Sequence, residues 1–281
     1  MNNKIFEKGN IDWAKDHILD ELDKFISIYD LRPVKNNKGG MLFPQMFYFY
    51  FLLKIIKPDI VVESGIYKGQ STWLIEKTLP NAEIIALDID LNQREYISKN
   101  VKYSSTDFKF QDFSNISKNS LVFFDDHINH VDRLLESKYF NFKHVVFEDN
   151  YPPGKGDFQT LKQLYNKHTF VHNPGLLSLI KTNLILSKII IKKTFIRNYN
   201  VKKEIDKLSK RIRDGYSYNF SHLEQLIESY FEFPPLTLNS NTNSDLRLLM
   251  KDPLFEKVPE HLKKYTNYLG GYNFLTYIKL L

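Results

Sequence analysis

Cysteine does not occur among the 281 residues of this chain. Its absence excludes disulfide bonds, thiolate zinc sites and a cysteine nucleophile. A chain without cysteine fits a reducing compartment, and we expect a cytoplasmic protein. Internal repeats are also missing, so a repeat architecture is not expected.

Long uninterrupted apolar runs are lacking as well. The stretch 41–58 is interrupted by Pro44 and Lys54, and the stretch 184–196 by three lysines. Neither stretch therefore qualifies as a membrane-spanning helix. The N-terminal residues lack the basic start and apolar core of a signal peptide. We expect a soluble protein.

A strong excess of one charge is not present either. The chain has 39 Lys and Arg against 33 Asp and Glu, a net charge of +6. The lysines are spread along the chain together with many Asn and Ile, which indicates AT-biased codon usage, so no nucleic-acid partner is expected. A hydrophobic fraction of 42% with 15% aromatics is typical of a folded globular protein.

From residue 58 onward, short apolar runs alternate with helical patterns. The runs are "DIVVE", "EIIALD", "FKFQD", "SLVFFDD" and "HVVFED", and the helices are expected at 71–79, 91–100, 130–137 and 158–168. Apolar strands joined by crossover helices are typical of a parallel sheet covered on both faces. The sequence predicts an α/β fold, a Rossmann-like doubly wound and mostly parallel sheet with an inserted helical hairpin.

Four segments describe the expected organisation of the chain. They are an N-terminal helical lead-in (1–57), a cofactor-binding α/β core (58–175), a basic helical insertion (176–232) and a C-terminal part that closes the sheet (233–281). A basic amphipathic helix can lie on an anionic membrane. We interpret the insertion instead as a packed hairpin with a solvated lysine face.

Acidic residues close the apolar runs. They are Glu63, Asp88, Asp112, Asp125, Asp126, Glu148 and Asp149. The carboxyl ends of parallel strands share one edge, where ligands bind at the point at which the strand order reverses. So many carboxylates cannot all stay ionised unless cations join them. The pattern therefore predicts a positively charged ligand, a metal ion or both.

The first turn, "ESGIYKGQST", carries Gly65 and Gly69 before a helix that starts near Ser71. Glycines let the backbone approach a ligand, and the helix N-terminus offers free amide donors. The spacing matches neither the Walker A motif nor the dinucleotide fingerprint. Glu63 would repel phosphate and attract an amine.

Two further acids narrow the choice of ligand. Asp88 ends the second run, where an acid accepts hydrogen bonds from both hydroxyls of a ribose. Asp112 is placed to meet an adenine amino group. Together with Glu63 they fit a nucleoside that bears an amine and no phosphate, of which S-adenosylmethionine is the common one.

The segments "VVESGIYKGQST", "LDID", "FFDDH" and "FEDNY" resemble class I S-adenosylmethionine-dependent methyltransferases. The resemblance covers about residues 58 to 170. It is specifically to the metal-dependent O-methyltransferases related to macrolide-sugar methyltransferases and to cephalosporin-hydroxylase-like proteins.

The resemblance implies a divalent cation, usually Mg²⁺, held by Asp126, Glu148 and Asp149. Asp125 is assigned to the cofactor. The catechol-type relatives suggest a second alignment, in which Asp126, Asp149 and Asn150 are the ligands and His127 packs near adenine.

We therefore expect metal-assisted methyl transfer to a hydroxyl of a small acceptor, with a sugar suggested by the family alone. His127 or His130 would take the proton. Two alternatives stay open: a nicotinamide-dependent oxidoreductase, and a non-catalytic methyltransferase-like binding module. The sequence does not decide whether the protein forms a homo-oligomer.

Overall fold

The computed structural model describes residues 7–11, 13–152, 155–168, 223–238, 251–269 and 273–281. The expected insertion therefore lies outside the described residues from 176 to 222. Among the described residues, no helix has both the length and the apolar character needed to cross a membrane.

One sheet of seven strands forms the centre, in the order β3-β2-β1-β4-β5-β7-β6. The strands are β1 (Ile60–Ser64), β2 (Glu83–Leu87), β3 (Val101–Ser104), β4 (Ser120–Phe124), β5 (His144–Phe147), β6 (Ile227–Glu232) and β7 (Thr276–Leu280). Strands β1 to β5 are parallel, and β7 runs antiparallel between β5 and β6. The predicted Rossmann-like, doubly wound and mostly parallel fold is confirmed. The strand order reverses between β1 and β4.

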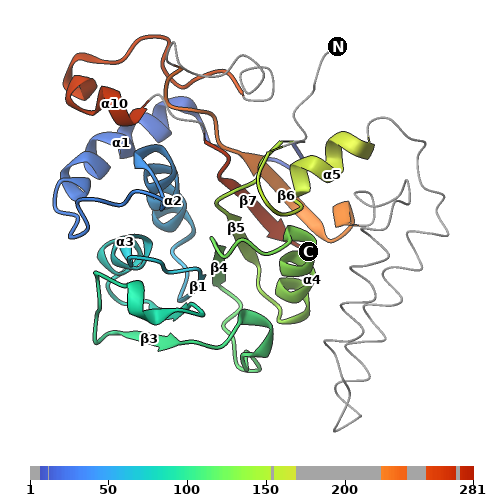
Figure 1. The fold of residues 1–281 in the computed structure, drawn as a ribbon. Coiled ribbons are helices and arrows are strands. Elements are labelled where there is room, and N and C mark those ends of the chain that lie inside the picture. The colour runs from blue at the N-terminus through green and yellow to red at the C-terminus, as the bar shows by residue number, and fades with distance from the viewer. Residues whose placement is uncertain (1–6, 12, 153–154, 169–222, 239–250, 270–272) are drawn as a thin grey trace, which may run out of the picture.

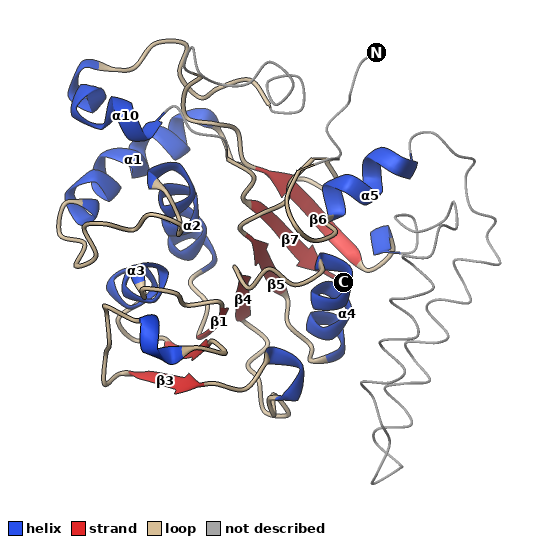
Figure 2. Cartoon of the chain, in the orientation of Figure 1, coloured by secondary structure: helices blue, strands red, loops and turns tan. Residues whose placement is uncertain are grey.

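Helices cover both faces of this sheet (Figures 1 and 2). They are α1 (Lys15–Tyr29), α2 (Phe43–Ile56), α3 (Gln70–Thr78), α4 (His130–Tyr139), α5 (Leu161–His168) and α10 (Thr266–Leu269), with 3-10 turns η1 (Leu91–Gln93), η2 (Phe108–Phe110) and η3 (Glu260–Tyr265). The side chains of α1, α2 and α3 share one hydrophobic cluster, and those of α4 and α5 belong to a second. The core is thus divided by the sheet.

The aromatic helix α2 anchors the N-terminal region to the sheet. It is apolar all round, as expected of a helix surrounded by protein, and Phe49 stacks on Phe123 of β4 with ring centroids 4.3 Å apart. The amphipathic helix α1 packs on its outer side, where Phe25 meets Phe43 at 5.2 Å. Helix α2 ends at Ile56, and the next residue, Lys57, adopts a left-handed conformation before Pro58.

Three expectations about local structure were wrong. The helix expected at 91–100 is only the short turn η1, because the following side chains of Tyr96 and Ser98 turn back to bind Glu76. The third strand is β3 and not "FKFQD", whose first residues form η2 because Phe108 is buried in the core. The end of the expected helical insertion forms strand β6, which pairs with β7.

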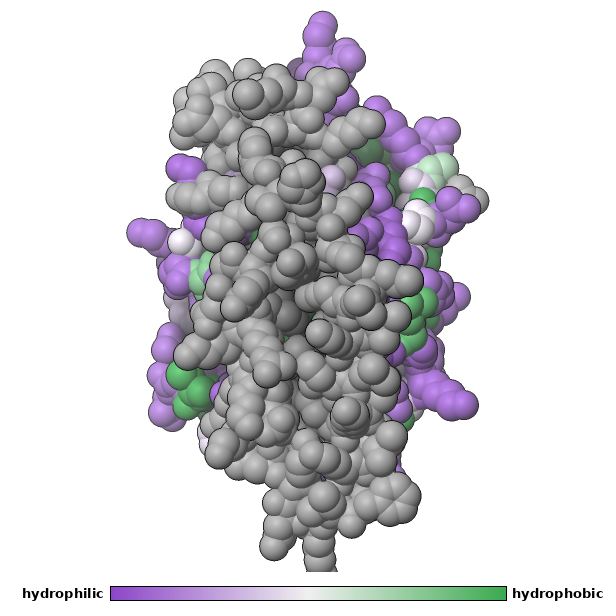
Figure 3. Space-filling model, turned by 90° about the vertical axis from the view of Figure 1, so that its right-hand side faces the viewer, coloured by the Kyte–Doolittle hydropathy of each residue, from purple (hydrophilic) through white to green (hydrophobic). Residues whose placement is uncertain are grey.

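Figure 3 shows one face of the molecule with the described side chains that are visible there. These side chains are mainly hydrophilic, and the hydrophobic areas between them are small and separate.

Candidate functional site

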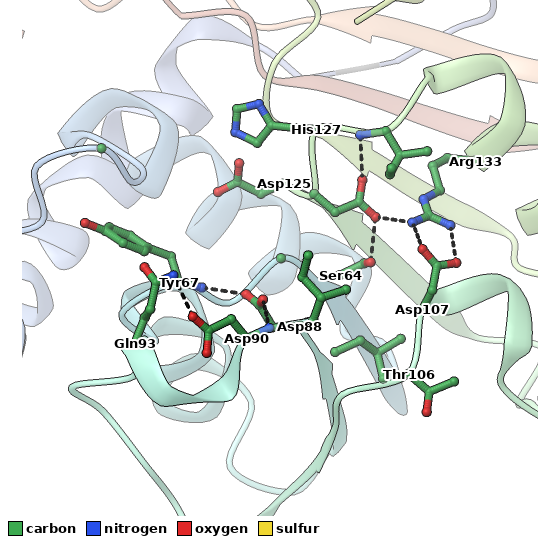
Figure 4. A pocket seen from close by; sticks show the side chains of 16 residues that line it. Ser64, Tyr67, Asp88, Asp90, Gln93, Thr106, Asp107, Asp125, His127 and Arg133 are labelled. Atoms are coloured by element: carbon green, nitrogen blue, oxygen red, sulfur yellow. Dashed lines mark hydrogen bonds and ion pairs between the residues drawn. The ribbon is translucent and has the colours of Figure 1, made fainter. Parts of the chain in front are cut away.

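A cavity of about 380 Å³ lies at the carboxyl ends of β1, β2 and β4, beside the point where the strand order reverses (Figure 4). Ligand pockets of this fold form at that position. The described residues that line it include five aspartates and one arginine. Its volume falls within the usual range for a small-molecule site.

The turn after β1 requires glycine, because its backbone passes very close to other backbone segments. Gly65 has φ +95°, and a Cβ there would lie 2.0 Å from the carbonyl oxygen of Asp125. Gly69, with φ +84°, caps α3 and would bring a Cβ within 2.7 Å of the Tyr96 carbonyl oxygen. Glycine at 65 therefore lets the turn pass close to the end of β4, and glycine at 69 lets it pass close to the segment after η1. Of the two, Gly65 lines the cavity.

Asp88 lies in the cavity wall, where the sequence placed it. Its Oδ2 accepts hydrogen bonds from the amides of Ile66 and Tyr67, at 2.8 and 3.0 Å, and its Oδ1 accepts one from the amide of Asp90 at 2.9 Å. The carboxylate thus holds the glycine turn in place. Because a carboxylate offers about four acceptor sites and three of them are used here, one site on Oδ1 can still accept a hydrogen bond from a ligand hydroxyl.

Glu63 and Ser71 are not part of the cavity wall. Successive strand residues point to opposite faces, so Ser64 faces the cavity while Glu63 lies with the helices α2 and α3, fully buried. The Thr72 hydroxyl donates to Glu63 Oε2 at 2.5 Å. Burial raises the pKa of Glu63 to about 7, although the Ser71 and Thr72 hydroxyls partly lower it. Its position gives no support to direct contact with a ligand amine.

The mutation Glu63→Gln is expected to stabilise the protein at alkaline pH. Burial raises the pKa of Glu63 from 4.5 to about 7, so the folded state binds the proton more tightly than the unfolded state. That contribution to stability is complete below the unfolded pKa and is lost as the pH rises through the folded pKa. Glutamine should remove a penalty of about 3 kcal/mol near pH 8 and none near pH 4. Urea unfolding of both proteins at the two pH values measures this, and identical pH dependence would contradict it.

The acid that follows β3 in the cavity wall is Asp107, and Asp112 lies outside the wall, exposed. The Asp112 carboxylate accepts a hydrogen bond from the amide of Ser114 at 3.0 Å. The sequence did not indicate Asp107 as a site residue, because the third strand was expected at "FKFQD", which begins after Asp107. The run "VKYS", which ends shortly before Asp107, was the signal that could have located it.

Arg133 of α4 is a second residue that the sequence analysis missed. Its side chain is 2% exposed and pairs with Asp107 (2.9 Å), Asp126 (2.7 Å) and Glu136 (2.8 Å). Burial alone would lower the pKa of Arg133, but these carboxylates raise it. No feature of the local sequence indicates that acids from two different strands meet this arginine.

The negative charge of Asp126 is therefore already paired with a cation of the protein, the guanidinium of Arg133. Its Oδ2 accepts from Arg133 at 2.7 Å and from the Ser64 hydroxyl at 2.6 Å. Asp126 lines the cavity, but it does not belong to the group of residues whose geometry suits a metal ion.

That group consists of Asp125, His127 and Asp149, whose potential ligand atoms all lie within 4.8 Å of one another. Burial and the neighbouring carboxylates, above all Asp149, raise the pKa of Asp125 well above its ordinary range. A divalent cation between the two carboxylates would remove this repulsion. Carboxylate oxygens are also the donors that Mg²⁺ prefers, so the residues present fit such an ion.

Of the three ligands predicted from the resemblance, Asp149 alone is a member of this group. Glu148 is 6% exposed, and burial together with Asp125 raises its pKa well above the ordinary range. Its side chain forms hydrogen bonds with Gln45 and Asp149. The structure thus places Glu148 behind the metal candidates, against the start of α2.

The side chain of Asn150 is buried, and both of its polar atoms already have partners within the protein. Its Nδ2 donates to the Tyr230 hydroxyl at 2.6 Å and to Thr276 Oγ1 at 2.9 Å, and its Oδ1 accepts from the Lys162 amide at 2.9 Å. Asn150 therefore joins the ends of β5, β6 and β7 to α5. This arrangement disfavours the alignment in which Asn150 would hold the metal.

The two histidine candidates occupy different environments. His127 has φ +54° and lies in the cavity wall, with its imidazole beside Asp125 (Figure 4). His130 is 3% exposed and stacks on Phe147 with centroids 3.9 Å apart. Burial lowers the pKa of His130 to about 3, which makes it a poor proton acceptor at neutral pH. The site therefore contains His127 and not His130.

The fold and the cavity together define a Rossmann-like protein with an acidic crevice at the strand-order reversal. No protein-family model and no curated protein sequence matches the chain. Similar solved structures include CmcI with SAH (16% identity, 52% of this chain and 80% of that chain, TM-score 0.35). They also include the N-terminal domain of EvdMO1 with SAH and D-fucose (16%, 41% and 56%, TM-score 0.32).

A third such structure is the SAH-bound Podospora anserina methyltransferase PaMTH1, with 10% identity over 97% of this chain and 99% of that chain and a TM-score of 0.40. The structural neighbours named here are thus methyltransferases or proteins with SAH bound. At identities and TM-scores this low, the matches carry no argument about the function of this chain.

Proposed function

We propose that the protein is an S-adenosylmethionine-dependent methyltransferase assisted by a divalent metal ion, acting on a hydroxyl of a small acceptor. The observation that carries the proposal is the charge of the cavity. Its described lining has five aspartates, and its single arginine is already paired with carboxylates. Such a cavity favours a cationic sulfonium and disfavours the pyrophosphate of a nicotinamide dinucleotide.

The cofactor would occupy the part of the cavity formed by the ends of β1 and β2. Asp88 has one acceptor site left for a hydrogen bond from a ribose hydroxyl. Ile89 is 85% exposed and Ile128 is 39% exposed, and both line the cavity. Exposed apolar side chains on two sides of a cavity suit a flat purine ring. S-adenosylmethionine would supply the methyl group as a sulfonium substituent.

Asp125 and Asp149 are the residues that would hold the metal ion. Mg²⁺ is commonly bound by one or two carboxylates while it keeps other positions for water and substrate. When bound, the ion would lower the pKa of the acceptor hydroxyl. We assign His127 as the proton acceptor, because imidazole is a less typical ligand for Mg²⁺ and has an ordinary pKa near neutral pH.

The glycan type of acceptor stays a prediction from the family resemblance. A nicotinamide-dependent oxidoreductase remains the second candidate, and the acidic cavity speaks against it. A non-catalytic binding module is the third. Metal binding by Asp125 and Asp149 together with cofactor binding would argue against this third candidate.

Calorimetric titration of S-adenosylmethionine, with NAD as the comparison, tests the proposal. The variant Ile89→Arg is expected to weaken S-adenosylmethionine binding more than tenfold, because it puts a bulky cation into the part of the cavity proposed for the purine of a cationic cofactor. Ile97→Arg is the matched control, since Ile97 is 64% exposed and does not line the cavity. Binding of NAD without binding of S-adenosylmethionine would overturn the proposal.

A further inference from the structure

The loop between β5 and α5 contacts His127 without forming part of the cavity wall. Nδ1 of His127 lies 3.3 Å from Oδ1 of Asp157. The next residue, Phe158, meets the imidazole edge-on, with ring centroids 5.7 Å apart. The imidazole therefore has a polar and an aromatic contact from consecutive residues of one loop.

The polar contact favours one of the two imidazole nitrogens as the one that carries the hydrogen. A carboxylate oxygen accepts hydrogen bonds and donates none. If Nδ1 of a neutral imidazole carried no hydrogen, Nδ1 and the Asp157 oxygen would both be acceptors, and no hydrogen bond could form between them. The contact favours the tautomer with hydrogen on Nδ1, and in that tautomer Nε2 carries the free electron pair.

The loop is held on both sides of Asp157. The Gln163 side-chain amide donates to the carbonyl oxygen of Lys155 at 2.8 Å. The backbone amide of His130 donates to the carbonyl oxygen of Gln159 at 3.1 Å. Because these contacts come from α5 and α4, Asp157 is presented by a segment that the fold fixes in place.

The backbone conformations on both sides of the contact are also specific. Gly156 has φ +75°, and a Cβ there would lie 2.6 Å from the ring of Tyr151. His127 adopts φ +54°, which is uncommon for a residue other than glycine. The turn before Asp157 and the left-handed backbone of His127 therefore bring the two side chains together.

We infer that Asp157 is a positioning residue for His127. It favours the Nδ1–H tautomer of His127, which leaves the electron pair on Nε2. The inference rests on the proposed function for the role of Nε2 as proton acceptor. Asp157 acts through the imidazole and needs no contact with the cofactor or the acceptor.

Long-range ¹H–¹⁵N NMR of protein labelled on histidine tests the inference, at a pH above the ordinary pKa of imidazole. The chain has eight histidines, and the variant His127→Ala identifies the signals of this one. We expect the Nδ1–H form in the unmodified protein. In Asp157→Ala we expect a shift to the Nε2–H form, which free histidine prefers. Asp157→Glu, which keeps a carboxylate, should restore the Nδ1–H form.

Folding is not expected to complicate this experiment, because the Asp157 side chain is 70% exposed. Asp20→Ala, which changes an exposed aspartate on α1, is the matched control and should leave the tautomer unchanged. An Nε2–H form in the unmodified protein, or a tautomer that does not respond to Asp157→Ala, would overturn the inference. The measurement needs neither metal nor cofactor, so failure of S-adenosylmethionine binding would refute the proposed function and leave this result standing.

Discussion

The mutation Asp149→Asn is expected to weaken Mg²⁺ binding by about a hundredfold or more. Asp149 and Asp125 are the two carboxylates of the candidate metal group, and loss of one leaves the ion with a single charged ligand. Cofactor affinity should change little, because Asp149 does not line the cavity. Calorimetry with Mg²⁺, or electron paramagnetic resonance with Mn²⁺, measures the loss.

The matched control is Asp126→Asn, which changes a neighbouring acid that the family resemblance would make a ligand. Because Asp126 is bound to Arg133 and Ser64, this variant is expected to retain metal affinity within a few fold. Loss of metal affinity in Asp126→Asn together with retained affinity in Asp149→Asn would contradict the assignment of the ligands. It would mean that Asp126 leaves Arg133 to bind the ion.

The mutation Arg133→Met is expected to cost about 3 to 5 kcal/mol of stability. The Arg133 side chain is 2% exposed, and its guanidinium pairs with three carboxylates. Its removal leaves these charges buried or partly buried without a cation, and they come from α4 and from the ends of β3 and β4. Urea unfolding at neutral pH measures the change.

Two variants separate this effect from a general loss of packing. Lys264→Met removes an exposed pair with Asp30, whose side chains are 59% and 48% exposed, and should cost less than about 1 kcal/mol. The double variant Arg133→Met with Asp107→Asn should recover part of the loss, because it removes one of the unpaired charges. Strictly additive effects would show that the pair contributes nothing.

The strands that the sequence located correctly are those with continuous apolar runs. Strands β1, β2, β4 and β5 each contain a run of apolar residues, because the sheet is covered on both faces there and these residues belong to its two hydrophobic clusters. Strand β3 lies at the sheet edge, and its residues Lys102 and Tyr103 gave a weaker pattern than the neighbouring Phe108 and Phe110. The burial of Phe108 in a 3-10 turn depends on tertiary contacts that periodicity does not contain.

The sequence predicted those residues of the candidate site whose position depends only on where a strand ends. Asp88, Asp125 and Asp149 follow strands that were placed correctly, so their common edge followed from the topology. Glu63 was misjudged because a shift of one residue along a strand changes the face to which a side chain points. Arg133 of α4 pairs with acids that follow β3 and β4, and no pattern in the sequence near Arg133 indicates this pairing.

The position of β7 within the sheet has a consequence for the order of folding. His144 of β5 pairs with Lys279 of β7, so this side of the sheet joins segments that are distant in the sequence, which slows their association. Asn150, which follows Asp149, is held by Thr276 and Tyr230. During synthesis these contacts can form only after β7 has left the ribosome. A nascent chain that already contains every proposed ligand therefore still lacks the support that fixes Asp149.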